Sequence, residues 1–244
     1  MKRIFSALAL LILAAQAFAQ EVMISDSSTI PPFEGVIGYR IRYEGKVNPA
    51  MRPYLPDSAT LHVGKNGLLY HYHGGQSGQM QAQVVWDGEA QTFWLLDSTR
   101  HTANSTSELW PGYIPVAKKT TDKPIKVAGR TCNSLTLTTE KVSIVDKKVT
   151  KEVEKIWVND SIRYGGQLVD SLKKFQPAFL GARIWSIPLM TKRTQAGEVT
   201  TVMEAITITP SPQDKWMFKV PEGFRTREFD PSKLIHPILE PKTE

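Results

Sequence analysis

The chain has a single cysteine, Cys132, among its 244 residues. One cysteine cannot form an internal disulfide, so the fold must be held together by its hydrophobic core. Cys132 lies in a strand-like run over residues 130–135, with no histidine or acidic residue in that run. This setting favours a buried, unreactive thiol over a catalytic nucleophile.

Common catalytic and cofactor motifs are also missing. The sequence contains no His-Glu-x-x-His zinc motif, no glycine-rich phosphate loop and no paired carboxylates in an aromatic setting. Residues 75–79 begin like an esterase nucleophile elbow but lack its last glycine, and their glycine-rich flanks are typical of a loop. We therefore predict a protein that is not an enzyme and that carries no cofactor and no resident metal.

No hydrophobic run is long enough to span a membrane, and the longest one has the pattern of an export signal. Lys2 and Arg3 precede an apolar run over residues 4–15, and residues 17–19 (Ala-Phe-Ala) match the site that signal peptidase cleaves. The run is shorter than the roughly 20 residues that span a bilayer. We predict a signal peptide over residues 1–19 and a periplasmic or secreted mature protein with no transmembrane segment.

The charge balance is only mildly basic. The signal peptide carries two of the 30 basic residues, which leaves 28 against 24 acidic residues and a formal charge of +4. Such a surplus attracts anionic partners weakly, and export makes nucleic acid an unexpected partner. Without an evident linker, the mature 225 residues (244 − 19) predict a flexible lead-in over 20–32, one domain over 33–229 and an extended tail over 230–244.

Alternation of apolar and polar residues predicts a mainly β domain. One helix is expected over 167–175, where Leu168, Leu172 and Phe175 recur at helical spacing. The connection over 110–124 shows no strand pattern. Many strands with so little helix indicate a strongly curved antiparallel sheet or open barrel. The expected strands cover residues 35–43, 60–63, 68–73, 81–86, 91–96, 134–144, 152–158, 183–190, 199–209 and 215–220.

Four segments carry a resemblance to a known family. They are residues 33–39 (FEGVIGY), 85–88 (VWDG), 125–132 (IKVAGRTC) and 214–224 (DKWMFKVPEGF). Their order and spacing resemble an uncharacterised family of exported bacterial proteins whose fold is similar to that of the lipoprotein carriers LolA and LolB. The resemblance implies an open half-barrel with one or two short helices over its concave face. In the carriers, the cavity so formed holds acyl chains.

Aromatic side chains are the candidate ligand contacts, because apolar binding sites commonly use aromatic walls. Tyr39 and Tyr43 share one face of the first expected strand. Trp94 and Trp185 lie in later expected strands, where core packing is the ordinary role of a tryptophan. We predict that these four residues line a cavity for a hydrophobic small molecule or acyl chain.

A hairpin rich in histidine offers a second kind of site. If Asn66 and Gly67 form a two-residue turn, His62 lies opposite His71, and His73 is a diagonal neighbour within reach of a shared metal ion. The opposite face of this hairpin carries the aliphatic and tyrosine side chains and is the expected core side. No acidic residue adjoins the hairpin, so the histidine face is interpreted first as a solvated surface, and a metal site is the less favoured alternative.

The leading hypothesis is a non-enzymatic periplasmic protein that binds a lipid or acylated polypeptide in the concavity of a half-barrel. A first alternative is a cell-envelope interaction module that docks a partner protein through a sheet edge or the tail. A second is a metal-binding protein that uses His62, His71 and His73.

Overall fold

The computed structural model describes the greater part of the expected domain. The predicted signal peptide lies outside the described residues, as do nearly all of the lead-in and the whole tail. The described residues are 30–50, 52–75, 82–106, 116–119, 122–142, 149–166, 168–169, 185–195 and 199–228.

The protein is mainly β, as predicted. Twelve strands follow one another in a single open sheet in the order β13-β6-β5-β4-β3-β2-β1-β12-β11-β10-β9-β7, and β8 pairs with β9 outside this order. Every pairing is antiparallel except that of β13 with β6. The strands are β1 (Gly35–Gly45), β2 (Ser58–Val63), β3 (Gly67–His73), β4 (Ala82–Asp87), β5 (Thr92–Asp97), β6 (Thr102–Thr106), β7 (Val116–Lys119), β8 (Ile125–Val127), β9 (Arg130–Val142), β10 (Val149–Arg163), β11 (Ser186–Gln195), β12 (Val199–Pro210) and β13 (Arg225–Glu228).

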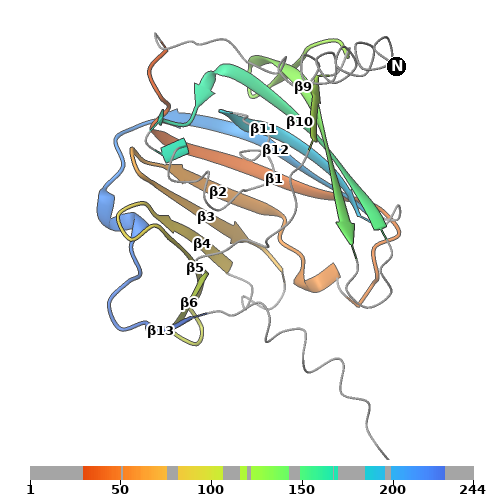
Figure 1. The fold of residues 1–244 in the computed structure, drawn as a ribbon. Coiled ribbons are helices and arrows are strands. Elements are labelled where there is room, and N and C mark those ends of the chain that lie inside the picture. The colour runs from red at the N-terminus through yellow and green to blue at the C-terminus, as the bar shows by residue number, and fades with distance from the viewer. Residues whose placement is uncertain are drawn as a thin grey trace, which may run out of the picture.

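The sheet is strongly bent and does not close into a barrel. Figure 1 shows the long strands β9 to β12 as one wall and the shorter strands β2 to β6 as the other, with β1 between them. The two ends of the strand order, β13 and β7, remain edges. The open half-barrel predicted from sequence is therefore present in outline.

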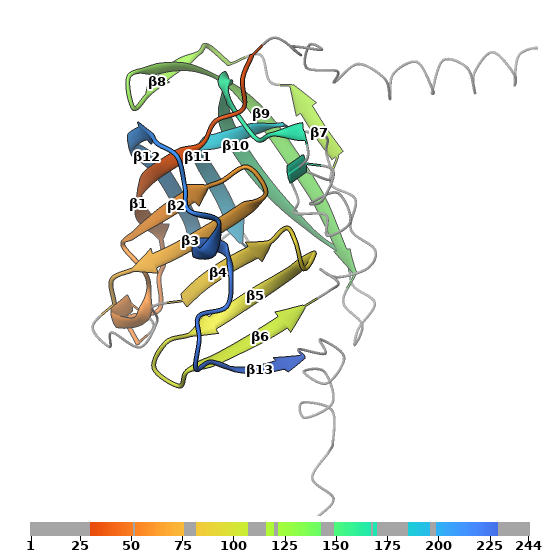
Figure 2. The same cartoon turned by 90° about the vertical axis from the view of Figure 1, so that its left-hand side faces the viewer.

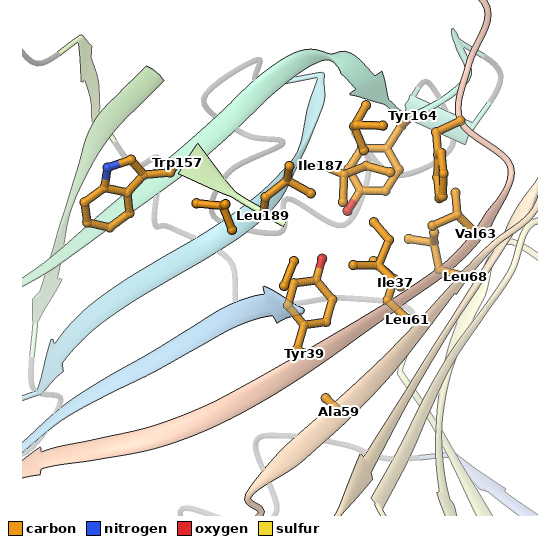
Figure 3. Packing of buried hydrophobic residues seen from close by; sticks show 14 of the residues in the cluster. Ile37, Tyr39, Ala59, Leu61, Val63, Leu68, Trp157, Tyr164, Ile187 and Leu189 are labelled. Carbon is orange, nitrogen blue, oxygen red and sulfur yellow. The ribbon is translucent and has the colours of Figure 1, made fainter. Parts of the chain in front are cut away.

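Strict alternation along β1 assigns the two faces of the sheet. Ile37, Tyr39 and Ile41 are buried, whereas Val36 and Arg40 on the other side are partly or fully exposed. We call the first side the inner face and the second the outer face. In Figure 3, side chains from β1 to β3 and side chains from β10 and β11 point toward one another across the bend, and together they form the main core.

The predicted helix over 167–175 is visible only at its beginning. Leu168 and Val169 are helical and fully buried against the main core, and the rest of the predicted helix lies outside the described residues. The buried Leu168 fits its predicted place on the apolar side of the helix.

Some sequence-based strand assignments are wrong. Residues 215–220 were expected to form a strand, but Lys215–Phe218 form a short 3-10 helix, η3. The connection over 110–124 contains the strand β7, and the polar strands β6 and β13 were not expected. A second short 3-10 helix, η1 (Arg52–Tyr54), follows β1.

The segment after β12 crosses the outer face of the sheet. Figure 2 shows it running over β2 and β3, through η3, and down to the edge strand β13 beside β6. Its Phe218 is buried against Val85, Leu96 and Ala103 on the outer face of β4 to β6, in a second hydrophobic cluster. We call residues 211–228 the strap. The strap covers apolar side chains that an open sheet would otherwise expose.

Candidate functional site

The inner face of the bent sheet is the candidate site, because the bend brings distant strands together there. Tyr70 in β3 and Tyr164, which follows β10, are separated by five steps between neighbouring strands. At about 4.8 Å a step, the path along the sheet is roughly 24 Å. The two side chains nevertheless lie close enough for each to affect the pKa of the other. The two walls of the sheet therefore meet at the end of the concavity where Tyr70 and Tyr164 lie.

Tyrosines dominate this meeting point. Tyr39, at the centre of β1, is fully buried, and its hydroxyl donates a hydrogen bond of 2.9 Å to the carbonyl oxygen of Pro188 in β11. Tyr70 and Tyr72 stack on β3 with ring centroids 6.1 Å apart. Tyr43 is half-buried further along β1 and donates to the carbonyl oxygen of Pro56 at 3.0 Å. We call Tyr39, Tyr43, Tyr70, Tyr72 and Tyr164 the tyrosine group.

Burial keeps these phenols neutral. It raises the pKa of Tyr39 well above the ordinary value, and the neighbouring Tyr70 and Tyr72 add to the rise. Burial likewise raises the pKa of Tyr70 and of Tyr164. A neutral phenol is both a donor and an acceptor. The tyrosine group can therefore hold hydrogen bonds inside an apolar core at any working pH.

One charged pair lies on the same face. Glu154 of β10 and Arg193 of β11 are direct partners in register. Across the bend, Glu154 contributes to the raised pKa of Tyr70, and Arg193 opposes the burial that raises the pKa of Tyr72. Both charged side chains are half-buried. Aliphatic residues and tyrosines thus close one end of the concavity, and the charged pair Glu154 and Arg193 lies beside it.

The inner face becomes progressively more exposed toward β5. Trp86 of β4 is fully buried, its register partner Phe93 is half-buried, and Leu95 is 49% exposed. Val84, the partner of Leu95, is also only half-buried. Among the residues that the structure describes, the inner face of β4 and β5 is where apolar side chains are accessible to a ligand.

The four residues predicted to line a cavity do not form one site. Tyr39 and Tyr43 share the inner face, as expected from alternation, but Tyr39 is a core residue. Trp94 pairs with Val85 and lies on the outer face, against the cluster under the strap. Trp185 is 39% exposed and lies just before β11. The expected common aromatic wall is therefore incorrect for Trp94.

Other inner-face residues were not singled out as ligand contacts. Alternation in β3 identifies Tyr70 and Tyr72 as core-side residues, which they are, but it does not bring them near β10. Glu154 and Arg193 lie in strands that are rich in charge on both faces. Only the bend shows that this pair borders the concavity.

The histidine hairpin has a different register from the expected one. The turn is the four-residue run 64–67, so His62 pairs with Leu69 instead of His71, and His71 pairs with Thr60. The slip of two residues leaves all three histidines on the outer face. No cluster of three potential metal-ligating side chains occurs within the described part of the chain.

Each histidine has a different environment on the outer face. The His62 nitrogen Nδ1 lies 3.0 Å from Oε1 of Gln213 in the strap, and Nε2 of His73 lies 3.0 Å from the Thr60 hydroxyl. The His71 and His73 rings are 4.1 Å apart. Nε2 of His71 is buried and has no hydrogen-bond partner in the described structure. This arrangement disfavours a proton on His71.

Acidification is expected to destabilise the protein partly through His71. Burial lowers the pKa of His71, and the nearby His73 and His62 lower it further. The unfolded chain, with an ordinary histidine pKa of about 6.5, then binds the proton more readily than the folded chain. Stability falls as the pH drops through about 6.5 and continues to fall until the folded form is also protonated.

The replacement His71→Gln should reduce this loss. The check is the thermal midpoint of both proteins at several values between pH 8 and pH 5. An equally steep decline in the variant would show that His71 is not a source of the acid sensitivity.

Cys132 is buried, and burial raises the pKa of its thiol. A thiol in this state is mostly protonated at neutral pH and is a poor nucleophile. Its environment agrees with the unreactive role expected from the sequence. The loop over residues 75–79 is described only at Gly75.

No known protein-family model matches this chain, and no curated protein matches its sequence. None of the helical segments in the described residues is long and apolar enough to cross a membrane. The fold and the inner face therefore carry the functional inference.

Proposed function

We propose that this protein, once exported, binds a lipid or acyl chain against the inner face of its open half-barrel and carries out no chemistry on it. The observation that supports the proposal is the graded exposure of apolar side chains from Trp86 through Phe93 to Leu95. A continuous inner face that is fully buried at one end and open at the other gives an acyl chain a surface to extend the core. Burial of apolar area is worth about 25 cal/mol per Å².

We further propose that the ligand lies along β4 and β5. The end held by the tyrosine group is closed, because Tyr70 and Tyr164 approach each other from the two walls and the Tyr39 hydroxyl donates a hydrogen bond to β11. A chain that enters from the β5 side reaches Val84 and Trp86 before it meets this barrier. The acyl chain therefore packs along β4 and β5.

The variant Leu95→Asp should weaken ligand binding at least about tenfold, because an acyl chain would desolvate the new carboxylate. The measurement is a titration of the delipidated mature protein, residues 20–244, with the fluorescent fatty acid cis-parinaric acid. Leu95 is already half-exposed, so the substitution should leave the fold intact.

Ile206→Asp is the matched control. Ile206 is an apolar strand residue of similar exposure, 53%, and it lies on the outer face of β12 beside Gly38. The control should bind the probe like the original protein. Equal weakening by both variants, or no probe binding by the original protein, would overturn the proposal.

A further inference from the structure

The edge strand β13, at the end of the strap, places two arginines on the inner face of the sheet. In the parallel pairing of β13 with β6, Thr226 lies opposite Ala103, which is buried in the cluster on the outer face. Because side chains alternate along a strand, Arg225 and Arg227 lie on the inner face. Both arginines are exposed. Figure 2 shows their strand beside β6, at the edge of the wall formed by β2 to β6.

The arginines lie in line with the accessible apolar side chains of the inner face. One row across the sheet consists of register partners on β4, β5, β6 and β13, namely Val84, Leu95, Asn104 and Arg227. Neighbouring strands are about 4.8 Å apart, so Arg227 is about 10 Å from Leu95 along the sheet. Arg225 is two positions earlier on the same face, about 7 Å from Arg227. An acyl chain on Val84 and Leu95 would therefore have its head beside the two arginines.

The described residues offer no acid that balances these two charges on the same face. Among the inner-face positions described in β4 to β6 and β13, the one acid is Asp97. Asp97 is already engaged, since it pairs with Arg100 at 3.7 Å and its Oδ1 accepts two backbone N–H groups. Glu228 lies opposite Ser105 and hence on the outer face. Two positive charges are therefore left at the inner edge.

Two arginines of β1 provide a contrast. Arg40 and Arg42 are also two positions apart on one face, but both form ion pairs with Glu204, at 3.3 and 3.1 Å. Charged residues on an edge strand can also serve to prevent pairing with other chains. That role needs neither a single sign of charge nor a particular face, whereas β13 has both arginines on the face that carries the accessible apolar side chains.

The chemistry of the pair suits an anionic head. A guanidinium group donates hydrogen bonds in a planar fork that matches the oxygens of a carboxylate or a phosphate, and it stays charged at any working pH. Thr102 and Asn104 on β6 add neutral polar groups on the same face. The inner face thus offers an apolar surface on β4 and β5 and a cationic edge on β13, which together complement an amphiphile with a negative head.

We propose that Arg225 and Arg227 bind the anionic head, a carboxylate or a phosphate, of the ligand whose acyl chain packs along β4 and β5. This inference rests on the proposed function, because it assigns the head of the same ligand. It predicts that the protein selects anionic amphiphiles over neutral ones with the same chain.

The test compares one acyl chain with and without its charge. The mature protein is titrated at about pH 8 with cis-parinaric acid and with the uncharged methyl ester of this acid. We expect the acid to bind about tenfold more tightly than the ester, since charge-assisted hydrogen bonds are the stronger kind. High salt should reduce the difference, because exposed charges are screened.

Replacement of both arginines, Arg225→Gln with Arg227→Gln, should lower the affinity for the acid about tenfold and leave the affinity for the ester within about twofold. Both side chains are exposed, so the fold should tolerate the changes, and binding of the ester verifies that it does. Arg40→Gln with Arg42→Gln is the matched control, because it removes two arginines from the outer face. The control should bind both probes like the original protein.

Equal affinity of the original protein for the acid and the ester would overturn the proposal, as would equal behaviour of the two double variants. The arginines would then only protect the sheet edge, while binding of the acyl chain itself would stand. If neither probe binds, the proposed function fails and the assignment of the head fails with it.

Competition distinguishes the two kinds of head. Bound cis-parinaric acid is displaced with dodecanoate, with dodecyl phosphate and with the neutral dodecanol. The stronger of the two anionic competitors identifies the preferred head. Displacement by dodecanol as effective as that by both anions would overturn the proposal.

Discussion

Phe218→Ala is expected to lower the free energy of unfolding by about 4 kcal/mol, the usual cost of removing a buried phenylalanine ring. The ring is the only strap side chain that is fully buried, and it fills the space that Gly64 and Gly67 leave on the outer face. Its removal loosens the contact between the strap and Val85 and Leu96 beneath it.

Urea unfolding of the variant provides the measurement. Met217→Ala is the control, since Met217 is the partly exposed neighbour in the same turn and should cost well under 1 kcal/mol. A loss below 1 kcal/mol for Phe218→Ala would mean that the strap does not depend on this anchor. A loss equal to that of Met217→Ala would lead to the same conclusion.

Tyr39→Ala is expected to cost about 4 kcal/mol, because its ring lies at the centre of the core that joins the two walls. Tyr39→Phe retains the ring and removes only the hydroxyl, which leaves the Pro188 carbonyl oxygen without its donor. That change should cost about 1 kcal/mol. The two variants separate the packing of the bend from its hydrogen bond.

Both values come from chemical denaturation followed by tryptophan fluorescence. If Tyr39→Phe were as damaging as Tyr39→Ala, the hydrogen bond would be the main link between β1 and β11, and packing would be secondary. If neither variant were destabilised by more than 1 kcal/mol, the walls would not depend on the central tyrosine.

The hairpin from β2 to β3 shows how far local pattern extends. Alternation assigned the correct faces, because a slip of two residues leaves every side chain on its original side. The predicted two-residue turn at Asn66 and Gly67 was wrong. Gly64 and Gly67 are the first and last residues of the four-residue turn on which Phe218 packs. A contact with a residue about 150 positions later leaves no mark on the local sequence.

The strap shows the opposite case. Residues 215–220 are rich in apolar and aromatic residues, as strands often are, yet Asp214 caps a 3-10 turn there and Phe218 anchors it. The polar strands β6 and β13 have no apolar alternation. They form because β6 pairs with β5 and β13 pairs with β6 at the edge of the sheet. In both places, a contact with another part of the chain selects the conformation, and the local residue pattern does not.

The sequence by itself determined that the protein is mainly β, where most strands lie and which side of β1 is buried, because alternation is a local consequence of having one wet and one dry face. Only the tertiary structure decided the rest. Whether Trp94 lines the concavity, whether Glu154 meets Tyr70 and whether Trp216 projects into solvent all depend on the bend of the sheet and the path of the strap. Both arise from contacts between residues far apart in the chain, which no local spacing records.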